Sequence, residues 1–148
     1  MQLKGISKMI GILVVGHGKV PSGLRDAIRL IVGEQKEFYI ADFTSEITTK
    51  EYEIKVKKCL DDLETRCDGI LVFADMAGGS PYTIVKKASQ EHNKITVITG
   101  VNLPMLLEVV TVREFERNFD EFSNVIIQSA RDQITIKEYG KSTSNPLK

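Results

Sequence analysis

Two segments indicate the fold of this chain: Val14-Val15-Gly16-His17-Gly18 and Ala74-Asp75-Met76-Ala77-Gly78-Gly79-Ser80-Pro81. Each one follows a run of apolar residues and precedes a stretch with helical periodicity. Each therefore predicts the carboxyl end of a parallel strand that turns directly into a helix. In open α/β sheets, that edge is where ligands bind and where chemistry takes place.

The same alternation of strand and helix continues along the chain. Strands are predicted over residues 10–15, 37–43, 69–74 and 95–99. Helices are predicted from about Ser22 to a stop at Gly33, from a capping box at Thr48, from Ser80 as N-cap, over residues 105–112 after an Asn102 cap, and in a short segment capped by Asp120. This alternation predicts an α/β fold, a doubly wound and mainly parallel sheet with strand order 2-1-3-4.

The two ends of the chain differ from this pattern. Residues 133–139 alternate apolar and polar side chains, with Ile134 and Ile136 in one row, and predict an edge strand. Residues 1–8 are expected to form a short leader, residues 9–140 the single domain, and residues 141–148 a polar, flexible tail.

The composition is that of an ordinary globular protein. Twenty basic and 20 acidic residues give a formal net charge of zero, which provides no basic field for nucleic acid or for anionic membranes. No apolar run approaches the ~20 residues of a membrane span, so we expect no membrane insertion and a cytoplasmic location. Cys59 and Cys67 do not form a C-x-x-C pair and are expected to be reduced, structural thiols.

The two motifs are expected to meet in space. In the order 2-1-3-4, strands one and three are neighbours about 4.8 Å apart, so His17 and Asp75 face each other across one gap. Phosphoryl transfer onto an imidazole needs a free ring nitrogen as nucleophile, an acceptor that fixes the other nitrogen, and donors for the phosphoryl oxygens. His17 and Asp75 offer the first two. Gly78, Gly79 and Ser80, at a helix start, offer the third.

Each of these residues also has a simpler interpretation. A lone histidine in a glycine turn is often solvated, Asp75 could cap a loop, and Gly-Gly-Ser-Pro could be only a turn before a helix. His92 lies in a polar stretch and is interpreted as a surface residue without a role. The convergence of His17 and Asp75 at one topological switch point favours a functional site. No cluster of metal-ligating carboxylates is evident, so neither a metal nor another cofactor is expected.

Three ordered motifs carry a family resemblance. They are Gly16-His17-Gly18 with Ser22-Gly23-Leu24 after it, Asp75-x-x-Gly78-Gly79-Ser80-Pro81, and Gly100-Val101-Asn102-Leu103-Pro104-Met105-Leu106. With them the chain resembles, over roughly residues 9–139, the IIA component of the mannose-family sugar phosphotransferase system (PTS) of bacteria. One departure is Ala77, where the family often has a bulkier apolar residue.

The resemblance implies a function and a set of partners. The histidine phosphocarrier protein would phosphorylate His17, Asp75 would orient the ring, and Ser80 with Gly78-Gly79 would surround the phosphate. A separate IIB component would receive the phosphoryl group, and the membrane components IIC and IID would move the sugar. The resemblance further implies a homodimer that exchanges residues 133–139, which would hide an exposed sheet edge.

Three other functions remain open at this point. The first is the phosphotransfer subunit of a PTS-dependent dihydroxyacetone kinase, although the motifs at Gly78 and Asn102 argue against it. The second is a histidine phosphatase, which would need an arginine beside the first histidine and a second active histidine. The third is a regulatory or scaffolding dimer that has lost phosphoryl transfer, against which the retention of both His17 and Asp75 weighs.

Overall fold

The predicted sheet is present, with the predicted strand order. A computed structural model describes residues 8–116 and 118–141, which include one four-stranded, all-parallel sheet. Its strands are β1 (Gly11–His17), β2 (Phe38–Phe43), β3 (Ile70–Ala74) and β4 (Ile95–Thr99). They are arranged in the order β2-β1-β3-β4, so the chain reverses its winding direction between β1 and β3.

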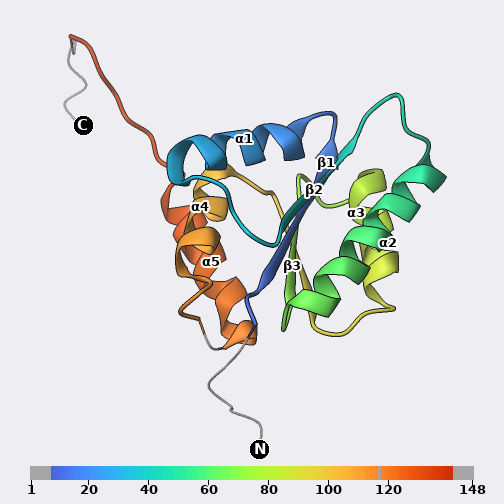
Figure 1. Ribbon diagram of the computed structural model, residues 1–148. Coiled ribbons are helices and arrows are strands. Elements are labelled where there is room, and N and C mark those ends of the chain that lie inside the picture. The colour runs from blue at the N-terminus through green and yellow to red at the C-terminus, as the bar shows by residue number, and fades with distance from the viewer. Residues whose placement is uncertain (1–7, 117, 142–148) are drawn as a thin grey trace, which may run out of the picture.

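Helices cover both faces of the sheet. They are α1 (Val20–Val32), α2 (Thr49–Arg66), α3 (Gly79–Ser89), α4 (Leu103–Val112) and α5 (Phe119–Asp132). Figure 1 shows α2 and α3 on one face and α1, α4 and α5 on the other. Among the described residues, none of these helices is both long and apolar enough to cross a bilayer.

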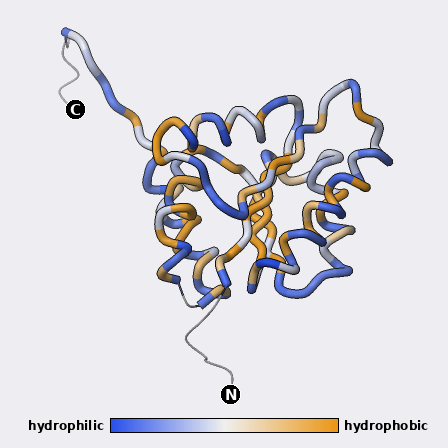
Figure 2. The backbone as a smooth tube through the Cα atoms, in the orientation of Figure 1, coloured by the Kyte–Doolittle hydropathy of each residue, from blue (hydrophilic) through white to orange (hydrophobic). Residues whose placement is uncertain are grey.

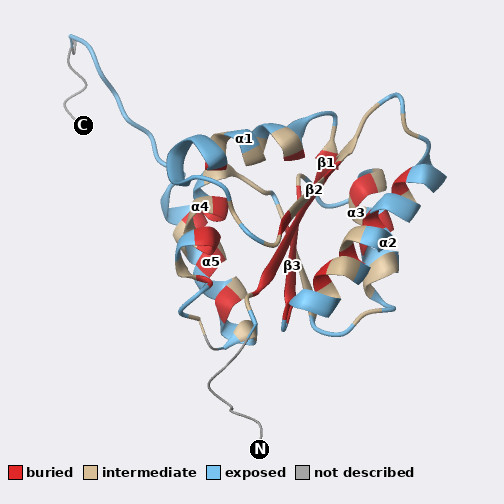
Figure 3. Cartoon of the chain, in the orientation of Figure 1, coloured by how far each residue is buried: buried red, intermediate tan, exposed pale blue. Residues whose placement is uncertain are grey.

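Two separate cores explain why the central residues of β1, 12–15, are all apolar. Ile12 and Val14 pack into the core under α1, α4 and α5, whereas Leu13 and Val15 pack into the core under α2 and α3. All four side chains are fully buried. The buried strands stand out between the two helical layers in Figure 3, and the same strands are the hydrophobic centre of Figure 2. His17 is the next residue in the row of Leu13 and Val15, so its side chain lies on the α2–α3 face of the sheet.

Two of the predicted helix caps are observed. The Thr48 hydroxyl accepts a hydrogen bond from the Glu51 N–H (3.1 Å), and the Asn102 amide oxygen accepts one from the Met105 N–H (2.9 Å). Each interaction satisfies a backbone donor in the first helical turn.

Two other predicted caps are wrong. The N-cap of α3 is Gly78, not Ser80, because Gly78 and Gly79 have φ values of +85° and +75° and turn the chain into the helix earlier. The N-cap of α5 is Asn118 rather than Asp120, because the Asn118 side chain accepts hydrogen bonds from the backbone N–H groups of Asp120 and Glu121. The resulting helix has 14 residues and is not short.

The strand predicted for residues 133–139 is not formed. Every residue from 133 to 141 is exposed, with Ile136 and Tyr139 each 90% exposed. Figure 1 shows this segment leaving the end of α5 and extending away from the domain. A strand needs a neighbour to pair with, and no strand of the described chain lies beside it. The exchange between two copies therefore stays a prediction.

The leader and the tail fall almost entirely outside the described residues, which begin at Lys8 and end at Lys141. The Lys8 backbone N–H donates to the Asp68 carboxylate (2.7 Å). This hydrogen bond holds the first described residue against the domain.

A buried arginine holds together the residues at the amino-terminal edge of the sheet. No pattern in the sequence indicated this arginine. Arg113 is only 3% exposed and donates to the carbonyl groups of Ile10, Glu37 and Lys36. Burial lowers the pKa of its guanidinium group. These contacts join the end of α4 to the residues that lead into β1 and β2.

Candidate functional site

His17 and Asp75 come together at the carboxyl edge of the sheet, as the topology predicted. His17 is the last residue of β1, and Asp75 follows the last residue of the neighbouring β3. The His17 Nδ1 and the Asp75 Oδ2 are 2.8 Å apart. The histidine side chain is 45% exposed and the aspartate side chain 17% exposed. A carboxylate held in the protein thus faces an imidazole that is open to solvent.

Asp75 is held by the backbone as well as by the ring. The His17 backbone N–H donates to Oδ2 at 2.8 Å, and the Asp75 N–H donates to the Val15 carbonyl at 3.2 Å. Burial raises the pKa of Asp75, but hydrogen bonds from the backbone N–H groups of His17 and Met76 and from the His17 ring outweigh that effect, so the pKa is lower than usual. The carboxyl group is therefore ionised at neutral pH.

Gly16 makes this close approach possible, and the sequence analysis did not select it as a site residue. A Cβ atom at Gly16 would lie 3.0 Å from the Asp75 Cγ and 3.1 Å from Oδ2. Any larger residue would push the carboxyl group away from the ring. The available signal was a glycine that interrupts the apolar strand directly before the histidine.

The hydrogen bond to Asp75 decides which ring nitrogen can react. Because an ionised carboxylate can only accept, Nδ1 carries the proton, and Nε2 of the neutral ring keeps its lone pair. None of the described residues hydrogen bonds to Nε2. A Cβ atom at Gly79 would lie 3.2 Å from Nε2 and 3.0 Å from Cε1, so the glycine backbone lies directly against this part of the ring.

The start of α3 therefore lies beside the free nitrogen. The first N–H groups of a helix have no partner within the helix and attract anions. Gly78 and Gly79 form this start, and both are exposed, whereas Ser80 is half-buried. Among the described residues, no hydrogen bond joins the Ser80 hydroxyl to His17 or to Asp75. The glycine loop lies near Nε2 of His17, and Ser80 follows the loop directly in the chain.

Phe43 forms the opposite side of the site, and the sequence analysis missed it. In the register of β1 with β2, His17 is paired with Phe43. The two rings meet edge to face, with centroids 6.3 Å apart and planes at 80°. Phe43 in turn packs against Tyr52 of α2, with centroids 4.9 Å apart. The only signal in the sequence was the position of Phe43 as the last residue of the second predicted strand.

His92 is not a surface residue, which corrects the sequence-based interpretation. Its side chain is only 3% exposed, and Nε2 lies 2.7 Å from the Asp61 carboxylate of α2. Nδ1 lies 3.0 Å from the Ala88 carbonyl. The polar residues around it in the sequence concealed the fact that α2 supplies a carboxylate that covers the ring.

The remaining candidates do not add to the site. Cys59 and Cys67 are free thiols, as expected, and burial raises the pKa of Cys67 to about 11. Among residues 8–116 and 118–141, no group of three or more histidine, cysteine, aspartate or glutamate side chains could hold a metal ion.

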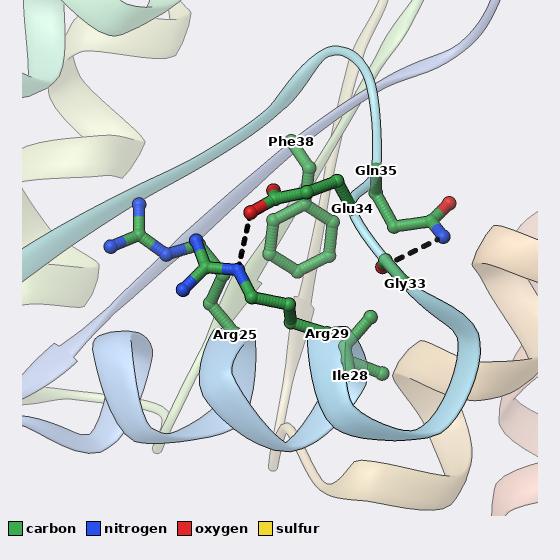
Figure 4. Close-up of a pocket in the computed structure, with 7 residues that line it drawn as sticks. All are labelled: Arg25, Ile28, Arg29, Gly33, Glu34, Gln35 and Phe38. Atoms are coloured by element: carbon green, nitrogen blue, oxygen red, sulfur yellow. Dashed lines mark hydrogen bonds and ion pairs between the residues drawn. The ribbon is translucent and has the colours of Figure 1, made fainter.

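A small cavity lies away from the site. Its volume is about 80 Å³, and it opens where α1 leads into β2. Figure 4 shows Arg29 in this cavity facing Glu34, with Nε and the carboxylate oxygen 2.5 Å apart. The cavity is lined by Arg25, Ile28, Arg29, Gly33, Glu34, Gln35 and Phe38. None of these residues belongs to the His17 site.

Comparison with known proteins places this geometry in a family. A family model described as "PTS system fructose IIA component" matches residues 11–127. The fructose-specific EIIA component of Bacillus subtilis is 30% identical over 106 residues, which cover 72% of each protein. The mannose-specific EIIAB component of Escherichia coli K12 is 28% identical over 84% of this chain, which spans only 38% of that protein.

A solved structure agrees with this match. The phosphotransferase system component EIIA from Streptococcus agalactiae superposes with a TM-score of 0.79 at 29% identity, covering 86% of this chain and 97% of that one. The family model and the Bacillus subtilis relative have nearly the same description, so both indicate the same family. The chain belongs to the mannose family of PTS IIA components.

Proposed function

We propose that this protein is a phosphocarrier that accepts a phosphoryl group on Nε2 of His17 and passes it on. The observation that carries the proposal is the 2.8 Å contact between Nδ1 and the Asp75 carboxylate, which places the proton of the neutral ring on Nδ1 and the lone pair on Nε2 of a side chain that is 45% exposed. PTS EIIA components are phosphotransferases as a class, and this geometry supports a phosphohistidine intermediate for the present chain.

The proposed transfer is a displacement at phosphorus. The Nε2 lone pair attacks the phosphorus of a phosphohistidine on the donor protein, while the donor P–N bond breaks and its electron pair returns to the donor imidazole. The His17 ring becomes positively charged, and the Asp75 carboxylate stabilises that charge through Nδ1–H. The reverse steps release the group to the next carrier.

The phosphoryl oxygens are proposed to face the start of α3. Gly79 lies against Nε2, and Gly78 and Ser80 are its neighbours in the chain, so the proposed donors are the backbone N–H groups of Gly78 and Gly79 and the hydroxyl of Ser80. Their partial positive charges favour an anion at this position. We include Ser80 with the two glycines as phosphate-binding residues.

The proposed partners follow from the family. The histidine phosphocarrier protein supplies the phosphoryl group, a IIB component receives it, and the membrane components IIC and IID use it for sugar uptake. The proposed place of action is the cytoplasm, with residues 9–140 as the phosphocarrier domain. The E. coli relative is an EIIAB component, in which A and B units are joined in one protein, and this supports a IIB component as receiver.

A homodimer is also proposed. Ile134, Ile136 and Tyr139 are 77–90% exposed on a segment that alternates like a strand. Pairing of this segment with the sheet of a second copy would bury these side chains and satisfy its backbone groups. Sedimentation of the full chain is expected to give a dimer, and removal of residues 133–148 is expected to give a monomer.

The alternatives are less well supported. The relatives described above are sugar-specific PTS components, which does not favour the dihydroxyacetone kinase subunit. A histidine phosphatase would need a second reactive histidine, but His92 is covered and both of its ring nitrogens are engaged.

Mass spectrometry tests the proposed function. After incubation with phosphoenolpyruvate, enzyme I and the histidine phosphocarrier protein, one phosphoryl group is expected on His17. His17→Ala is expected to fold and to remain unmodified, while His92→Ala serves as the control and accepts the group. Phosphorylation of His17→Ala would overturn the assignment.

A further inference from the structure

The His17 ring lies between two different neighbours, one on each side. On the α3 side is Gly79, whose backbone lies against Cε1 and Nε2 and carries no side chain. On the β2 side is Phe43, whose ring lies edge to face with the imidazole, with the two ring centroids 6.3 Å apart. His17 and Phe43 are register partners on adjacent parallel strands, so both side chains emerge on the same face of the sheet.

The hydrogen bond to Asp75 alone does not fix the ring. It holds one atom, Nδ1, at 2.8 Å from the carboxylate, and a ring held at one atom can still tilt about that contact. Tilting would move Nε2, which lies on the far side of the ring from Nδ1. The ring contact that opposes this motion from the β2 side is the one with Phe43.

Phe43 is itself supported from the core. Tyr52 is completely buried and meets Phe43 with centroids 4.9 Å apart and planes at 67°. The Tyr52 hydroxyl donates to the Ala41 carbonyl of β2, and burial raises the pKa of this hydroxyl, so it stays protonated as a donor. A row of three rings thus runs from the core of the α2–α3 layer to the reactive imidazole.

We propose that Phe43 is a positioning residue for phosphoryl transfer. It keeps the His17 ring in the orientation in which Nδ1 faces Asp75 and Nε2 lies beside Gly79 at the start of α3. Correct alignment of a nucleophile with phosphorus is a large part of catalysis in phosphoryl transfer. The proposal rests on the phosphocarrier function proposed above.

The kinetic test compares two identical substitutions. Phe43→Leu removes the ring but keeps an apolar side chain, and Phe115→Leu makes the same change at a residue that is 76% exposed and follows α4. With the phosphorylated histidine phosphocarrier protein as substrate, Phe43→Leu is expected to lower kcat about tenfold with KM unchanged. Phe115→Leu is expected to change neither. Phe43→Tyr keeps the ring and is expected to restore the wild-type kcat.

A spectroscopic test needs no phosphoryl donor. Nitrogen-15 NMR of the imidazole reports how the proton divides between Nδ1 and Nε2. In Phe43→Leu the Nδ1–H share of His17 is expected to fall, and in Phe43→Tyr it is expected to equal that of the wild type. This readout separates the two proposals, because it tests the positioning even if the wild-type protein accepts no phosphoryl group.

Several results would overturn the role of Phe43. One is a wild-type kcat in Phe43→Leu, and another is a change confined to KM, which would make Phe43 a docking residue. An unchanged tautomer ratio, or an equal loss of kcat in Phe43→Tyr, would also overturn it. If Phe43→Leu does not fold, Phe43→Met is measured in its place and is held to the same outcomes.

Discussion

The two histidines of this chain have similar partners and opposite surroundings. Each ring has a nitrogen within 2.8 Å of an aspartate oxygen, His17 with Asp75 and His92 with Asp61. The His17 side chain is 45% exposed, whereas that of His92 is 3% exposed. His17 uses Nδ1 for its carboxylate and keeps Nε2 open. His92 uses Nε2 for its carboxylate and Nδ1 for the Ala88 carbonyl, so no nitrogen remains.

This difference shows that a histidine–aspartate pair alone does not make a reactive site. A nucleophilic ring needs a nitrogen with a lone pair that a partner can reach. The ring of His92 faces two acceptors, which favours the doubly protonated form. Burial by itself would lower the pKa of His92, but the Asp61 and Ala88 hydrogen bonds and the Glu64 and Asp61 charges raise it overall. The surroundings of His92 thus favour its protonated form.

The largest expected effect separates the two aspartates. Asp75→Asn removes the negative charge that stabilises the His17 ring as it becomes positive, and we expect phosphoryl transfer to fall roughly 100-fold. Asp61→Asn makes the same change at His92 and is expected to leave the transfer rate unaltered. Rapid-quench measurement of His17 phosphorylation gives both rates. Equal rates in Asp75→Asn and the wild type would contradict the role of Asp75.

The next effect compares two glycines with positive φ. The backbone conformations at Gly79 (φ +75°) and Gly33 (φ +84°) both favour glycine. An added Cβ atom would contact the His17 ring at Gly79, whereas at Gly33 it would meet nothing within 4 Å. Gly79→Ala is expected to lower the transfer rate about tenfold, because the added methyl group displaces Nε2. Gly33→Ala is expected to lower stability by about 1–2 kcal/mol without a change in rate. A normal rate in Gly79→Ala would show that the ring tolerates displacement.

Much of the carboxyl edge could be predicted from the sequence, for a physical reason. Parallel strands covered on both faces are continuous apolar runs, and the residue after each run must lie at the same edge. The order 2-1-3-4 then brings His17 and Asp75 together, as the structure shows.

The remaining features depend on contacts that local patterns do not contain. The burial of His92 requires Asp61, which lies 31 residues away, and the burial of Arg113 requires carbonyl groups that precede β1 and β2. Phe43 became recognisable only through the register of β1 with β2. Residues 133–139 have the alternation of a strand, but alternation cannot say which chain supplies the neighbouring strand.

A smaller effect is expected in the pH dependence of stability. A raised pKa in the folded state means that His92 contributes its full stabilisation below its unfolded pKa of about 6.5 and loses it as the pH rises through the folded value. His92→Gln cannot titrate and is expected to cost about 1–2 kcal/mol at about pH 6, with a smaller cost at about pH 9. Urea unfolding of both proteins at the two pH values measures this. A constant difference would mean that His92 is neutral throughout.

The smallest expected effect comes from removing one of two helix caps, Asn102 or Asn118. Asn102 caps α4 at the carboxyl edge, where the Val101 N–H also donates to the Ala74 carbonyl, and Asn118 caps α5. Asn102→Ala and Asn118→Ala are each expected to lower the free energy of unfolding by about 1 kcal/mol, because each leaves helix N–H groups without their acceptor. Neither is expected to change the transfer rate, since no hydrogen bond joins either side chain to His17 within the described part of the chain. A slower transfer in Asn102→Ala alone, with equal losses of stability, would show that the loop after β4 belongs to the reactive edge together with His17 and Asp75.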